Sequence, residues 1–200
     1  MSRTTRMPRM PRMPRILAAA ITLAAAPLAA QSHAAMAGMN VMVGTQAMYP
    51  SKDIVDNAVN SKDHTTLVAA VKAAGLVETL KTKGPFTVFA PVNAAFAALP
   101  AGTVDNLLKP ENRAALTGVL TYHVVAGNVD AAALERAIRA GRGTATLKTV
   151  SGGTLTAMMN GPRNIVVRDA QGNVANVTTY DVRQSNGVIH VVDRVLLPAM

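Results

Sequence analysis

The sequence predicts a single domain of the α+β class, with most helices in its first half and most strands in its second. Between residues 54 and 140 apolar residues recur with the 3.6-residue period of amphipathic helices, interrupted by a strand-like stretch at 86–90. From residue 144 onward the period changes to two, and short turn sequences separate the repeats. Because turns this short can join only antiparallel neighbours, the second half is expected to form a meander of strands.

The helices are predicted from their apolar spacing and from the residues at their ends. Residues 54–59 and 67–74 each place apolar side chains on one side of a helix, and Gly75 is typical of the left-handed residue that closes one. Further helices are expected within 76–83, 94–99, 104–108, 111–121 and 131–140. The residues expected to cap the helices that follow them are Asn93, Thr103 and Asp130.

The strands are predicted from alternation and from the turns that bound them. "FTVFA", residues 86–90, alternates between two prolines. The later strands are "TATLKTV", "TLTAMM", "NIVVRD", "VANVTTY" and "GVIHVVDRVLL", separated by "SGG", "NGP", "AQGN" and "SNG". The polar stretch "TTYDVRQSNG", residues 178–187, is therefore expected to run as a loop between the last two strands.

The first 34 residues predict a secretory signal peptide. Five arginines and no acidic residue precede an apolar run at residues 16–30, which is shorter than the about 20 residues that a membrane-spanning helix needs. Small residues at Ser32 and Ala34 favour cleavage after Ala34; cleavage after Ala30 and an uncleaved anchor are the alternatives. The mature protein is then secreted or periplasmic, with no transmembrane anchor.

The next stretch, residues 35–50, shows no clear period and is interpreted as a flexible Met-rich linker to a domain at 51–198. Thioethers are soft ligands that suit Cu(I), so an exported methionine cluster is an alternative candidate for copper handling. Its members are Met36, Met39, Met42 and Met48. The competing interpretation is sequence drift beside a leader that is itself rich in methionine.

Composition and motifs argue against several classes of function. The chain has no cysteine, which excludes disulfides, thiolate metal sites and a cysteine nucleophile. The net charge of +9 falls to +4 once the five leader arginines are removed, so no nucleic-acid partner is expected. No G-x-S-x-G or H-E-x-x-H pattern is present, and the sequence predicts no enzyme and no cofactor.

Three stretches, in order, resemble the fasciclin (FAS1) family: "FTVFAPVNAAFAALP" at 86–100, "TYHVVAG" at 121–127 and "SNGVIHVVDRVLLP" at 185–198. The resemblance implies a bacterial single-domain secreted protein with antiparallel β-sandwich-like sheets wedged by several short helices. It also implies a non-enzymatic module, expected to be monomeric, that binds a surface or envelope protein or a glycan. The residues expected to be structural within these blocks are Tyr122, His123, Asn186, Gly187, His190 and Asp193.

The histidines pose the main question of interpretation. His190 lies in an apolar strand whose two faces are both apolar, and a histidine there is more often a neutral, hydrogen-bonded core residue than a ligand. His123 is expected to bond to the backbone where a helix gives way to a strand. His64, at a helix start, is expected to be exposed.

The candidate binding residues are Tyr180, Asp181, Val182 and Arg183. A loop on a rigid sheet is a suitable place for recognition, and a tyrosine beside opposite charges is a suitable anchor. Some animal fasciclin domains have an Asp-Ile pair at the similar place, implicated in adhesion, but valine replaces isoleucine here and the flanking residues do not match. The alternative is that Asp181 caps a turn and Val182 fills the core.

Overall fold

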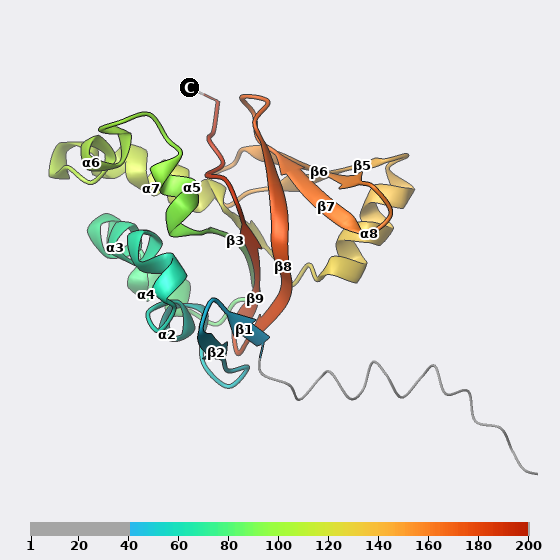
Figure 1. The fold of residues 1–200 in the computed structure, drawn as a ribbon, viewed down its shortest axis with the longest axis horizontal. Coiled ribbons are helices and arrows are strands. Elements are labelled where there is room, and N and C mark those ends of the chain that lie inside the picture. Colours follow the sequence, from blue (N-terminus) through green and yellow to red (C-terminus); the bar gives the residue numbers. More distant parts are fainter. Residues whose placement is uncertain (1–40, 200) are drawn as a thin grey trace, which may run out of the picture. The chain divides into compact units, whose positions relative to one another are not determined.

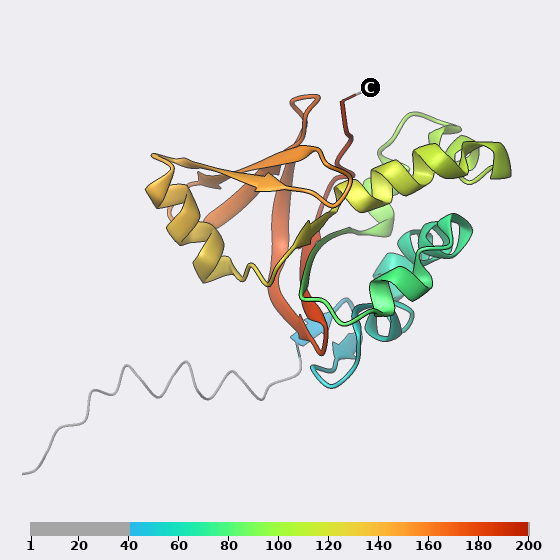
Figure 2. The same ribbon diagram turned by 180° about the vertical axis from the view of Figure 1, so that it is seen from behind.

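The computed structural model of the protein describes residues 41–199, whose helices and strands are drawn in Figures 1 and 2. The helical elements are α2 (Ile54–Ala58), η1 (Lys62–His64), α3 (Thr65–Ala74), α4 (Val77–Lys81), α5 (Asn93–Ala97), α6 (Thr103–Leu107), η2 (Pro110–Asn112), α7 (Arg113–Tyr122) and α8 (Ala131–Ala140). The strands are β1 (Val41–Val43), β2 (Gln46–Met48), β3 (Phe86–Pro91), β4 (Val124–Ala126), β5 (Thr144–Lys148), β6 (Thr154–Asn160), β7 (Asn164–Arg168), β8 (Val174–Gln184) and β9 (Gly187–Val192). The predicted α+β class is confirmed.

One seven-stranded sheet organises the domain, in the order β4-β3-β9-β8-β7-β6-β5. The strands from β5 to β9 pair antiparallel with their neighbours in sequence, as the short turns predict. β3 and β9 are far apart in sequence and pair in parallel, with Phe86 opposite Gly187 and Phe89 opposite His190. The first and third family-like stretches therefore lie side by side at the centre of the sheet.

The sheet folds over so that its two edges meet. β8 changes register twice against β9, and Asp181 sits at the break with a φ of 54°. At the edges, the N–H of Val150 donates to the carbonyl of Val124 at 2.8 Å, and Val125 bridges to Thr149. The sandwich-like arrangement thus comes from one sheet that is continuous through β8.

Two hydrophobic cores lie on opposite faces of β3 and β9. Val88 and Ile189 face the core shared with helices α2 to α7, which lie to one side of these strands in Figure 1. Phe89 and Val192 face the core enclosed by the folded sheet, which α8 covers near β5 and β6 (Figure 2). Every residue of β9 is buried, as expected for a central strand with two apolar faces.

The helix ends follow the predicted capping residues in part. Asp130 accepts a hydrogen bond from the Ala133 N–H at 2.8 Å, and Gly75 closes α3 with a φ of 72°. Asn93 does not cap its own helix: its Oδ1 accepts from the Thr66 N–H, so it caps α3 from a distance of 27 residues in sequence. Thr103 makes no capping bond either, because Gly102 occupies the position before α6.

The predicted linker is wrong for residues 41–48, which form the hairpin β1–β2. Val43 and Met48 are only 4% and 3% exposed and belong to the helix-side core. The pattern escaped prediction because each strand has only three residues, so that neither shows a measurable period. Residues 35–40, like the predicted signal peptide, lie outside the described residues.

The two methionines of this hairpin provide a matched pair of variants. Met48→Ala should lower the free energy of unfolding by about 2–3 kcal/mol, because it removes a buried side chain from the core. Met42→Ala should change it by less than about 0.5 kcal/mol, since Met42 is 55% exposed. Urea unfolding followed by circular dichroism measures both, and equal effects would contradict the packing of the hairpin.

Candidate functional site

His190 uses both ring nitrogens inside the protein. Nε2 lies 2.9 Å from the carbonyl oxygen of Val129 and therefore carries the proton, whereas Nδ1 accepts from the Asp181 N–H at 3.4 Å. The ring stacks on Phe89 with 5.6 Å between centroids and is fully buried. Burial lowers the pKa of His190. This neutral ring joins β9 to β8 and to the segment before α8, and neither nitrogen is left for a ligand.

His123 is held in the same way at the end of α7. Its Nδ1 donates to the carbonyl of Val119 at 2.8 Å, and its Nε2 accepts from the N–H of Leu196 at 2.9 Å. Burial lowers the pKa of His123 to about 4. The ring thereby fastens the C-terminal segment, which follows β9, to α7.

His64 is buried, at 4% exposure, so the prediction that it is exposed is wrong. The turn η1 directs the ring inward, where Nδ1 lies 2.8 Å from the Ser61 hydroxyl. Nε2 has no hydrogen-bond partner among the described residues. Beside the ring is a cavity of about 30 Å³, large enough for one water molecule.

Asn186 joins the turn before β9 to the helical half of the domain. Its Oδ1 accepts from the N–H of Ile54 at 3.1 Å, and its Nδ2 donates to the carbonyls of Leu80 and Thr82 at 2.7 and 3.1 Å. The side chain therefore satisfies backbone groups at the start of α2 and the end of α4.

Tyr122 and Asp193 connect other parts of the sheet. The Tyr122 hydroxyl donates to the carbonyl of Thr154 at 2.6 Å and accepts from the N–H of Ala170 at 2.9 Å. The carboxylate of Asp193 accepts two bonds of 2.8 Å from Asn176, one from its backbone and one from its side chain. Each of these residues therefore has a structural role.

The four candidate binding residues lie within β8 and not in a loop. The Tyr180 hydroxyl donates to Asn164 Oδ1 at 2.8 Å and accepts from the Ile165 N–H at 2.9 Å, and Asp181 accepts from the Ala131 N–H at the start of α8. Val182 is 1% exposed, in the helix-side core.

Arg183 differs from its three neighbours in β8. Its side chain is 64% exposed, and its guanidinium lies 3.8 Å from the carboxylate of Asp130. The contacts of the other three match the structural alternative, with Asp181 capping a helix in place of a turn. Binding of a partner at this strand stays a prediction, for which Arg183 offers the accessible side chain.

The methionine candidates are only partly within the described residues. Met48 is buried in the core, so it could bind a metal only if the hairpin opened. Met42 is exposed, and Met36 and Met39 lie outside the described residues. Within residues 41–199 no group of three His, Asp or Glu side chains could hold a metal ion, and none of the helices described there is long and apolar enough to cross a membrane.

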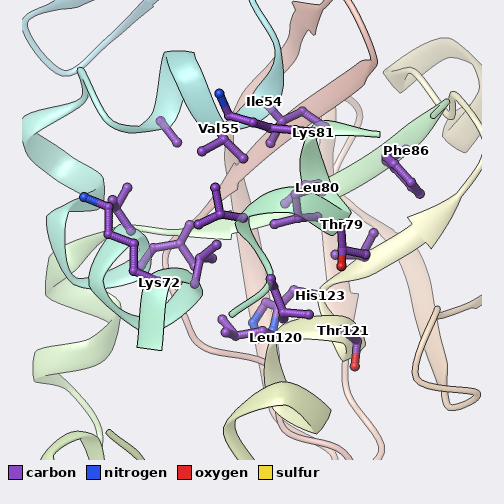
Figure 3. A pocket seen from close by; sticks show the side chains of 18 of the residues that line it. Ile54, Val55, Lys72, Thr79, Leu80, Lys81, Phe86, Leu120, Thr121 and His123 are labelled. Carbon is purple, nitrogen blue, oxygen red and sulfur yellow. The ribbon is translucent and has the colours of Figure 1, made fainter. Parts of the chain in front are cut away.

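An apolar pocket of about 260 Å³ lies among α2, α3, α4, β3 and β4 (Figure 3). Its lining side chains are mostly aliphatic. The apolar residues that line it are Ile54, Val55, Ala58, Val59, Leu67, Val68, Val71, Leu76, Val77, Leu80, Phe86, Val88, Phe89, Leu120, Val124 and Val150. The pocket is therefore an apolar hollow beside the helix-side core, with the exposed Val59 and Val150 in its lining.

The charged residues of this pocket are Asp56, Lys72 and Lys81, and in Figure 3 the amines of the two lysines lie at its periphery. Lys81 Nζ is 2.8 Å from Asp56 Oδ1, and this hydrogen bond raises the pKa of Lys81. Lys72 makes no salt bridge to a described residue. The periphery consequently carries one positive charge that no described carboxylate neutralises.

Sequence reasoning missed this pocket. Its residues come from short helices and from strands whose patterns predict an ordinary core, and no single stretch carries a motif. The one available signal is Lys72 and Lys81, which follow apolar positions on consecutive helices. That signal is too common on helix surfaces to indicate a cavity.

One folded sheet, with a central parallel pair and a layer of short helices on one side, defines the class of this domain. A model of the fasciclin domain matches residues 62–198, and the chain belongs to the fasciclin domain family. The resemblance of the three sequence stretches is thereby confirmed.

Individual relatives agree with this assignment. Protein sll1483 of Synechocystis is 45% identical over 80% of this chain and 82% of its own length. The cell surface glycolipoprotein MPB83 of Mycobacterium bovis is 30% identical over 98% of this chain and 83% of its own. Among solved structures, a FAS1 domain pair from the insect cell adhesion molecule fasciclin I has the same fold, with a TM-score of 0.63 and 18% identity over 73% of this chain and 51% of that one.

Proposed function

We propose that the protein is exported and acts as a non-enzymatic binding module at the cell surface or in the envelope, where it contacts a protein or a glycan. Membership of the fasciclin family is the observation that carries this proposal. One relative supports it by name, as a cell surface glycolipoprotein, and the same fold occurs in a cell adhesion molecule. The basic leader and short apolar run at residues 1–34 support export.

The chemistry of the buried groups fits a binding module better than an enzyme. His123 and His190 each use both ring nitrogens in hydrogen bonds within the fold, so neither has a free nitrogen to act as a base. A rigid domain held by such bonds suits recognition through its surface, because little order has to be created when a partner binds.

Arg183 allows this proposal to be tested without disturbing the fold. Removing Tyr180 or Asp181 would break hydrogen bonds to β7 or α8, and any loss of binding would then report on stability. Arg183→Ala removes only a weak, exposed ion pair with Asp130. If β8 meets the partner, this change should weaken binding roughly fivefold with the melting temperature unchanged.

The measurement begins with capture of envelope components on the immobilised protein, followed by affinity measurements with the purified component. Arg163→Ala, a charge loss at the exposed turn between β6 and β7, is the matched control. Equal affinities for the two variants would show that the partner binds elsewhere. Failure to capture any specific protein or glycan would contradict the proposed function itself.

A further inference from the structure

The size of the apolar pocket between the short helices and β3 suits a small hydrocarbon. Its volume of about 260 Å³ exceeds the roughly 150 Å³ of an engineered cavity that binds benzene. Scaled from the six carbons of benzene, the space accommodates about ten carbon atoms. A single medium-length alkyl chain is of this size, whereas a folded protein segment with its backbone is not.

The lining favours hydrocarbon over water. The uncharged polar side chains of the lining are Thr79, Thr121 and His123. The Thr121 hydroxyl donates to the carbonyl of Thr117, and both nitrogens of His123 are bonded, which leaves the Thr79 hydroxyl as the one uncharged polar side chain of the lining without such a bond. Water inside such a pocket would find few partners, since a buried water normally makes two to four hydrogen bonds. An apolar ligand that displaces it would gain free energy.

The pocket is open to ligands at an apolar rim. Val59 and Val150 both line it and are 49% and 48% exposed, although most valines of the described chain are buried. Exposed apolar side chains beside an open hollow are typical of binding sites. The tail of a ligand could therefore enter while its polar end stayed in water.

The charge at the periphery of the pocket indicates which polar head group a bound ligand would carry. Asp56 neutralises Lys81, which leaves the ammonium of Lys72 as the charge to be matched. A carboxylate complements an ammonium, whereas a cationic head group would be repelled. We propose that this pocket binds a medium-chain fatty acid, with the alkyl tail among α2, α3, α4 and β3 and the carboxylate beside Lys72.

Decanoate, with ten carbons, is the probe for this proposal, and decyltrimethylammonium is its cationic counterpart. Titration calorimetry with the full chain should show one saturable site for decanoate. Lys72→Glu should weaken decanoate binding roughly threefold to fivefold, the range of one exposed ion pair, and should strengthen binding of the cation. Arg168→Glu, the same charge change at an exposed position of β7, a strand that contributes no residue to the pocket, should alter neither affinity.

A second variant tests the location of the tail. Leu80→Trp should abolish binding of both amphiphiles by filling the pocket, and α4 tolerates the larger side chain because none of its residues is buried. Val68→Phe fills the same space from α3 if circular dichroism shows that Leu80→Trp does not fold. Retained decanoate binding in a folded, filled variant would overturn the proposal.

Other occupants give distinguishable results. In methyl NMR of the full chain, resonances of Val59 and Val150 should shift on addition of decanoate and stay constant on dilution. Shifts on dilution would indicate a second copy of the chain in the pocket. Contacts from these methyl groups to methionines of residues 1–39 that decanoate does not displace would indicate the chain's own segment. Either result, or no decanoate binding at all, would overturn the proposal.

Discussion

Replacing Gly187 by alanine should lower the free energy of unfolding by about 4 kcal/mol, one of the largest effects expected of a single methyl group. A Cβ at this position would lie 2.0 Å from the carbonyl oxygen of Phe86, far inside van der Waals contact. The obstacle is backbone and belongs to β3, which is packed between two cores and cannot retreat. β3 and β9 would have to separate at their first residue pair, Phe86 and Gly187. The hydrogen bond from the Phe86 N–H to the carbonyl of Asn186 lies at the same place.

Gly118→Ala is the matched control for this change. Gly118 lies inside α7, and a Cβ there would meet no atom within 4 Å. Because alanine is the better helix former, the control should be neutral or more stable by up to about 1 kcal/mol. Urea unfolding curves of the two variants provide the comparison. If Gly187→Ala were as stable as wild type, β3 and β9 could not be packed as closely as the structure shows.

The sequence predicted most elements because their local signals agree with the fold. Gly75 and Asp130 mark helix ends that the structure reproduces. The sequence predicted too early an end for β8, because the alternation of apolar residues breaks at the bulge. There Asp181 adopts a left-handed backbone, and the side chains that follow it change faces. The polar stretch after Thr179 therefore has the pattern of a loop, although Val182 re-enters a core on the far side of the bulge.

The contacts that depend on distant segments were beyond sequence reasoning. Asn93 has the position of a cap for its own helix, but its amide reaches α3 and the carbonyl of Lys62 instead. The apolar pocket shows the same limit, since its lining residues have the pattern of a core and only their packing in three dimensions leaves the space open. The structural roles of His123 and His190, in contrast, could be predicted from the sequence, because the apolar pattern around them already indicates burial.

The same buried histidines should make the protein sensitive to mild acid. In the unfolded chain a histidine takes up a proton as the pH falls below about 6.5, whereas native His123 stays neutral until about pH 4. The unfolded state thus binds more protons between these values, and stability falls as the pH falls through this window. For His123 alone the loss should reach about 2 kcal/mol at pH 5 and about 3 kcal/mol at pH 4. The lowered pKa values of His64 and His190 add losses of the same sign.

Urea unfolding at pH 7.5, 6.5, 5.5 and 5.0 measures this effect in a range where carboxylates contribute little. His123→Gln should lower the free energy of unfolding at pH 7.5, because it disturbs the bonds to Val119 and Leu196. Between pH 7.5 and pH 5.0, however, this variant should lose about 2 kcal/mol less of its free energy of unfolding than the wild-type protein does. The native ring of His123 should remain neutral at pH 5 by NMR, with its proton on Nδ1. Equal stability of the wild-type protein at pH 7.5 and 5.0 would mean that His123 takes up its proton without unfolding. The C-terminal segment would then have to leave α7, since a protonated Nε2 cannot accept the N–H of Leu196.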